Sequence, residues 1–148
     1  MLGGSERRHL SLLSVSYCRM VGGMQGDGWY RGNWELRGEL FGGVQINGET
    51  RWLTGVAPHL RYHFATGTRF VPYVNVGAGV TLTDIRAPDL GNAFQFNLQG
   101  GIGMNYFIRN NLAMNIEGRY LHISSSGTSM PNNGVNTVGG FLGISTYF

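Results

Sequence analysis

The 148-residue sequence has a single cysteine, Cys18, no lysine, and no long run of apolar residues. One cysteine cannot form an intramolecular disulfide, and together with four scattered histidines it provides no metal-ligand cluster. The longest apolar stretches are only a few residues, whereas a transmembrane helix needs roughly 18. These absences exclude a helical membrane protein and give no support to redox or zinc chemistry, so we expect no cofactor and no metal.

Charge is also scarce, because Asp, Glu, Lys and Arg make up 13% of the chain against about a quarter in ordinary soluble proteins. All eleven basic residues are arginine, which suits bidentate contacts with phosphate or carboxylate, although genome base composition explains this equally well. We expect no nucleic-acid partner.

Glycine is abundant, with 25 residues, and the length allows one domain, residues 1–148. This composition suits closely packed strands.

Apolar residues recur at every second position over much of the chain. Between Phe94 and Ile108 the even positions are mainly apolar and the odd positions polar or small, and the same alternation recurs over 30–46, 52–64 and 70–83. A period of two indicates β-strands with two different faces. In a transmembrane barrel such strands turn the apolar face to lipid and the polar face to the lumen. We therefore predict that even-numbered side chains from Tyr30 onward face lipid and odd-numbered ones the lumen, with an antiparallel sandwich as the alternative fold.

Seven strands are predicted from these patterns. Bacterial barrels close with even strand numbers from about 8 upward, so we expect an eighth strand upstream of Met1 or within the first residues. The segment after Met1, with Glu6, Arg7 and Arg8, is a poor secretory signal. The predicted fold class is an all-β, antiparallel eight-stranded transmembrane β-barrel that is N-terminally incomplete here. The predicted strands are His9–Arg19, Tyr30–Ile46, Arg51–Phe64, Phe70–Thr83, Phe94–Ile108, Leu112–Ser124 and Asn136–Phe148.

The connections and the C-terminus favour the outer membrane of a Gram-negative bacterium. Tight turns are predicted at 65–69 and 109–111 and longer links at 84–93 and 125–135, and short turns are typical of the periplasmic end. The chain ends on Phe148, and its spacing from Phe141 and Gly143 resembles the C-terminal signal that the barrel-assembly machinery recognises. Thr146 departs from that signal, which usually has a bulky apolar residue there. We expect the assembly machinery as a partner during insertion.

The odd-numbered charges could be mistaken for an acid-base site. A barrel of about eight strands is filled by side chains, so charges inside it must pair with one another or with water. We interpret them as lumen packing, the aromatics as girdles at the membrane interfaces, and the glycine pairs Gly77/Gly79 and Gly101/Gly103 as relief of crowding. The charged set is Glu35, Glu39, Glu117, Arg31, Arg37, Arg61, Arg119, His59 and His63.

One small group of residues can carry chemistry. His122 and Ser124 continue the outward parity of their strand, and side chains two residues apart share a face at about 7 Å between Cα atoms. An imidazole can then reach a serine hydroxyl as its base. Antiparallel pairing places Asn136 opposite this pair, where it can orient the imidazole. A lone His-x-Ser occurs often by chance, and a polar pair at a wet barrel rim is the other interpretation.

The segments Arg119–Ser124 and Pro131–Asn136, with Gly127 between them, resemble the lipid A 3-O-deacylase (PagL-type acyloxyacyl hydrolase) family. The resemblance extends through 32–36 and 61–64 and covers about 10–148. It implies an outer-membrane esterase that removes the 3-O-linked acyl chain of lipid A, with Ser124 as nucleophile, His122 as base and Asn136 as third member. Asn136 stands where the family has an acid, and Ser125 follows the nucleophile where the family often has Asn.

Two functions of different classes follow. The first is a serine ester hydrolase acting on lipid A, with lipopolysaccharide of the outer leaflet as its partner. The alternative is a non-enzymatic outer-membrane barrel with a structural, adhesion or assembly role. The sequence makes no prediction about the oligomeric state.

Overall fold

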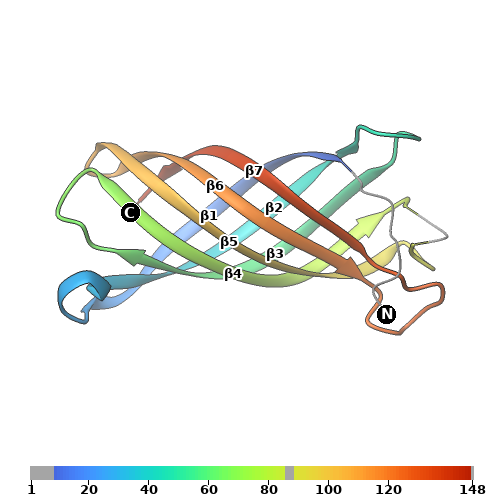
Figure 1. The fold of residues 1–148 in the computed structure, drawn as a ribbon, viewed down its shortest axis with the longest axis horizontal. Coiled ribbons are helices and arrows are strands. Elements are labelled where there is room, and N and C mark those ends of the chain that lie inside the picture. The colour runs from blue at the N-terminus through green and yellow to red at the C-terminus, as the bar shows by residue number, and fades with distance from the viewer. Residues whose placement is uncertain (1–8, 86–88, 148) are drawn as a thin grey trace.

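A computed structural model describes residues 9–85 and 89–147, which form one antiparallel sheet that curls round on itself (Figure 1). Each strand pairs with the next along the chain, in the order β1 to β7. A short 3-10 turn, η1 (Gly28–Tyr30), connects the first two strands, and no helix in the described residues has the length and apolar character to cross a membrane. The strands are β1 (Leu10–Gln25), β2 (Gly32–Gln45), β3 (Trp52–Phe64), β4 (Phe70–Thr83), β5 (Phe94–Arg109), β6 (Leu112–Ser124) and β7 (Val135–Thr146).

The alternation predicted from the sequence holds from β2 to β7. The registers between these strands pair even residues with even residues, as in Leu60 with Val76 and Ile102 with Gly118, except at the end of β5, where the register shifts and Arg109 pairs with Leu112. Because side chains alternate between faces, one parity stays outside around the whole sheet. Ile102 is 69% exposed, whereas Gln95 and Asn97 are buried inside. The prediction for these strands is confirmed, and the outer surface is apolar.

The first strand is longer than predicted, and its parity, for which no prediction was made, is opposite to that of the other strands. It runs to Gln25 rather than Arg19, and its outward residues are odd-numbered, Leu13, Val15 and Tyr17. The register with β2 pairs odd with even residues, as in Val15 with Leu40. The pairing becomes irregular between Val21 and Gln25, around Gly22 with φ of 72°. Such a bulge lets the strand continue into the hairpin.

The two ends of the sheet carry different connections. One end, called the turn end, carries the connections 26–31, 65–69 and 110–111 and the C-terminal end of β7 (Figure 1). The other, called the loop end, carries 46–51, 84–93 and 125–134. The predicted tight turns after β3 and β5 and the long links after β4 and β6 are therefore confirmed. Phe148, assigned to the assembly signal, lies outside the described residues.

Three buried carboxylates organise the middle of the interior. Glu117 accepts hydrogen bonds from Arg119 Nε at 2.6 Å, Tyr73 Oη at 2.8 Å and Arg61 Nη2 at 3.1 Å. Glu39 accepts from Arg119 Nη1 at 2.6 Å. Charges in a low-dielectric interior must be paired, and these are. The predicted network of paired charges in the lumen is therefore confirmed. The third carboxylate, Glu35, pairs with His63 and Arg61. Arg31 was also predicted to lie in the lumen, and that prediction is wrong, because Arg31 is exposed in the β1–β2 connection.

The interior changes character toward the loop end, where an apolar cluster replaces the charges. This cluster was not predicted, because the odd-numbered face was expected to be polar or small throughout. Buried apolar side chains can exclude water from this end of the lumen and hold the strand ends around it in place. The cluster consists of Phe41, Leu53, Ala57, Ile85, Leu90, Leu121, Ile123 and Val135.

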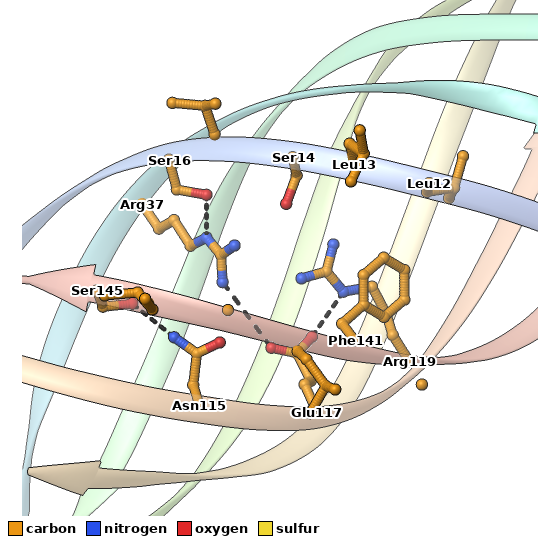
Figure 2. Close-up of a pocket in the computed structure, with 15 residues that line it drawn as sticks. Leu12, Leu13, Ser14, Ser16, Arg37, Asn115, Glu117, Arg119, Phe141 and Ser145 are labelled. Atoms are coloured by element: carbon orange, nitrogen blue, oxygen red, sulfur yellow. Dashed lines mark hydrogen bonds and ion pairs between the residues drawn. The ribbon is translucent and has the colours of Figure 1, made fainter.

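The sheet is open between β1 and β7. Within the described residues these two edge strands do not hydrogen-bond to each other, and a cavity of about 310 Å³ lies between them. Figure 2 shows Arg37 and Glu117 pointing toward one another in this seam, 3.8 Å apart. Six consecutive antiparallel pairings separate the edges, so β1 and β7 run in the same direction. The described residues contain no eighth strand, and residues 1–8, a predicted location for it, lie outside them.

Candidate active site

The predicted site residues lie where β6 reaches the loop end and β7 begins. Tyr120, His122 and Ser124 point outward, while the alternating Leu121 and Ile123 point into the apolar cluster. The buried pair anchors the strand from beneath, because moving it would expose apolar surface inside the barrel. The outward groups therefore sit on a rigid support rather than on a loop.

The structure brings His122 and Asn136 together. They face each other directly across the β6–β7 pair, and the Asn136 Oδ1 atom is 2.7 Å from His122 Nδ1. The same oxygen accepts a hydrogen bond from Tyr120 Oη at 2.6 Å. From the sequence, Tyr120 was expected only as one of the aromatics of a membrane-interface girdle. Its parity, two positions before His122, was the signal that could have placed it in this group.

Ser124 lies on the same face, two positions beyond His122, and is half-buried opposite Phe96 of β5. Among residues 9–85 and 89–147 its hydroxyl makes no hydrogen bond, so the structure does not join it to His122. Hydrogen bonds between catalytic groups are often long before substrate binds. With Nδ1 directed to Asn136, the other ring nitrogen, Nε2, is the one left for the serine.

The β6–β7 connection folds back on the end of β6. The backbone N–H of Ser125 donates to Asn132 Oδ1 at 2.8 Å, and Leu90 forms an isolated bridge with Asn132. Gly134 has φ of 73°, and a Cβ there would lie 3.1 Å from His122 Cε1. Glycine at this position therefore allows the loop to approach the imidazole closely.

The partner of the His122 imidazole carries no charge. No Asp or Glu of the described ranges bonds to His122, whose partner is the Asn136 amide. Nor do three His, Cys, Asp or Glu side chains gather as a metal site would require, anywhere in the part of the chain that the structure describes. The arrangement can orient the His122 imidazole on the same exposed apolar face as the Ser124 hydroxyl.

The family model described as "Lipid A 3-O-deacylase (PagL)" matches residues 15–145, a span that contains all of these site residues. The chain belongs to the lipid A 3-O-deacylase (PagL) family. The predicted resemblance is thus confirmed, and with it an outer-membrane β-barrel of a Gram-negative bacterium in a family of lipid A hydrolases.

A solved structure supports the fold of this PagL-family chain independently. The chain is similar to a solved structure described as "Crystal structure of the outer membrane enzyme PagL". The TM-score is 0.72, and the match covers 91% of this chain and 92% of that one. The sequences are 18% identical, so this likeness shows the shared fold. No curated protein sequence matches the chain significantly.

Proposed function

We propose that this protein hydrolyses an ester-linked acyl chain of lipid A, with Ser124 as nucleophile, His122 as general base and Asn136 as the residue that orients the base. The observation that carries the proposal is the 2.7 Å contact between Asn136 Oδ1 and His122 Nδ1 on the outward face. An acceptor at Nδ1 keeps the proton there, so Nε2 is a free base for the neighbouring serine.

The reaction follows from these roles. Ser124 Oγ attacks the acyl carbonyl carbon while His122 Nε2 accepts the serine proton. The tetrahedral intermediate then collapses, the bond between the acyl carbon and the lipid A oxygen breaks, and the imidazolium returns the proton to that oxygen. Water attacks the resulting Ser124 ester, again giving its proton to His122. The fatty acid leaves and the serine hydroxyl is restored.

The position of the site suits a substrate that is itself part of the membrane. Short turns are typical of the periplasmic end of such barrels, so we infer that the loop end is extracellular. The site then lies at the rim, at the level of the outer leaflet. Exposed apolar side chains surround it on neighbouring strands, namely Phe96, Leu98 and Val138. A lipid can approach from the side without leaving the bilayer.

Two alanine variants test the proposal. The purified barrel, refolded in detergent, is incubated with lipid A, and released fatty acid and residual lipid A are measured by mass spectrometry. We expect Ser124→Ala and His122→Ala each to abolish release while heat-modifiable migration of the folded barrel is unchanged. Ser14→Ala, at an exposed serine within β1, serves as the matched control. A folded wild type that releases no fatty acid, or a Ser124→Ala barrel that releases it at the wild-type rate, overturns the assignment.

We also propose that the barrel closes through one further strand between β1 and β7, which makes eight. Among the described residues both edges leave backbone groups unpaired, which is costly in hydrocarbon. Because the two edges run in the same direction, a single antiparallel strand can pair with both. Amide hydrogen exchange in the folded, membrane-inserted barrel tests this. The amides of β1 and β7 that point into the seam should be protected, and free exchange at those amides contradicts closure.

A further inference from the structure

Tyr120 shares one acceptor with the proposed catalytic base. On β6 it lies two positions before His122 on the same face, and across the sheet it is paired with Val138. Asn136 is therefore its diagonal neighbour, at a distance that a long aromatic side chain can span. The Tyr120 hydroxyl reaches Asn136 Oδ1 at 2.6 Å, the oxygen that also faces His122 Nδ1.

An asparagine in this place faces a difficulty that a carboxylate does not. Its two ends differ, because Oδ1 accepts hydrogen bonds and Nδ2 donates them. If Nδ2 turned toward His122, Nδ1 would have to accept and the ring proton would move to Nε2. An Nε2 that carries a proton cannot take another from Ser124, so this tautomer is unreactive. A carboxylate presents an acceptor whichever way it turns.

We propose that Tyr120 is a positioning residue, whose hydroxyl holds the Asn136 amide with its oxygen toward His122 and so sets the reactive imidazole tautomer. Within the described part of the chain the Tyr120 hydroxyl has no other partner. If the amide turned over, the Tyr120 O–H would have no acceptor among the described side chains, at an apolar surface where Tyr120 is 46% exposed. An unsatisfied donor costs about 1 kcal/mol or more, which corresponds to roughly a fivefold change in population.

The kinetic test compares Tyr120→Phe in two backgrounds and rests on the proposed function. In the natural chain, Tyr120→Phe should lower kcat for lipid A deacylation about fivefold, with KM nearly unchanged. In the Asn136→Asp chain, the same substitution should lower kcat less than about twofold, because a carboxylate has no wrong orientation. The matched control is Tyr106→Phe, an outward tyrosine near the turn end of β5, which should leave kcat unchanged. Equal losses in both backgrounds, or a loss confined to KM, overturn the proposal.

A second readout does not require hydrolysis. In micelles, ¹⁵N chemical shifts of the histidine ring nitrogens distinguish the two neutral tautomers, and His122→Gln identifies the His122 signals. We expect the Nδ1–H tautomer to predominate in the natural chain and the Nε2–H tautomer to increase in Tyr120→Phe but not in Tyr106→Phe. An unchanged tautomer ratio in Tyr120→Phe overturns the proposal. Should Ser124→Ala retain activity, the proposed function fails, while the tautomer ratio still decides the role of Tyr120.

Discussion

Asn136 Oδ1 lies 2.7 Å from His122 Nδ1 across the β6–β7 pair. In the proposed site of Ser124, His122 and Asn136, the third member is therefore a neutral amide and not an acid. An amide can fix the orientation of the imidazole, but it cannot offset the positive charge that develops when the imidazole takes the serine proton. Turnover should therefore be limited by the missing charge rather than by misplacement of the base.

Restoring a carboxylate at this position should accelerate the reaction. We expect Asn136→Glu to raise kcat for lipid A deacylation by about an order of magnitude or more, since Asn136 is exposed and the longer side chain has room to reach Nδ1. Asn136→Leu, which can neither accept a hydrogen bond nor carry charge, should lower it. Fatty-acid release by detergent-folded barrels measures both. A loss in Asn136→Glu as large as that in Asn136→Leu would show that charge at this position is not limiting.

A cation on the outer face should destabilise the barrel according to its depth. Ile102 lies near the middle of β5 and Ile108 near its turn end, and both point outward. We expect Ile102→Arg to lower the free energy of unfolding by about 2–4 kcal/mol and Ile108→Arg by no more than about 1 kcal/mol. Guanidinium titration of barrels folded into lipid vesicles gives both values. Equal costs at the two positions would contradict a membrane-spanning orientation of β5.

Removal of Glu117 should leave two buried cations with one carboxylate partner each, Glu35 for Arg61 and Glu39 for Arg119. Its carboxylate accepts from Arg61 and Arg119, both buried, and from Tyr73. Because each arginine loses one of its two buried carboxylate partners, Glu117→Ala should cost about 3 kcal/mol of unfolding free energy, the lower end of what breaking a buried pair costs. The control is Glu49→Ala, which removes an exposed ion pair with Arg51 and should cost less than about 1 kcal/mol. Similar costs for the two variants would argue against a tightly paired lumen.

The predicted relief of crowding by glycines can be tested at one inward and one outward position on paired strands. A Cβ at Gly103 would lie 2.4 Å from Cζ of Tyr73 and 2.6 Å from the backbone oxygen of Ile116, whereas one at Gly118 would meet nothing within 4 Å. We expect Gly103→Ala to destabilise the barrel by about 1–3 kcal/mol through overpacking and Gly118→Ala to have little effect. Urea unfolding of both variants checks this, and a neutral Gly103→Ala would show that Tyr73 moves freely.

The alternation of residues was sufficient to predict the barrel and the orientation of most of it. Over most of β2 to β7 the even positions are apolar and the odd positions polar or small, so each face could be assigned before any pairing was known. Ser11, Ser14 and Ser16 leave β1 without such a contrast, and its register with β2 reverses the parity. The parity and length of β1 therefore came only from the pairing.

For the site, the sequence determined which side chains point outward, because parity along a strand is a local property. It also placed His122, Ser124 and Asn136 on the same face. Only the tertiary structure decided which atoms meet, since the approach of Asn136 to His122 depends on the register of two strands separated by a loop. The same holds for Tyr120, which bonds diagonally across that register, and for Glu39 and Arg119, which are far apart in sequence and meet across the lumen because the sheet curls. Contacts of this kind depend on strand register and sheet curvature, which no short stretch of residues encodes by itself.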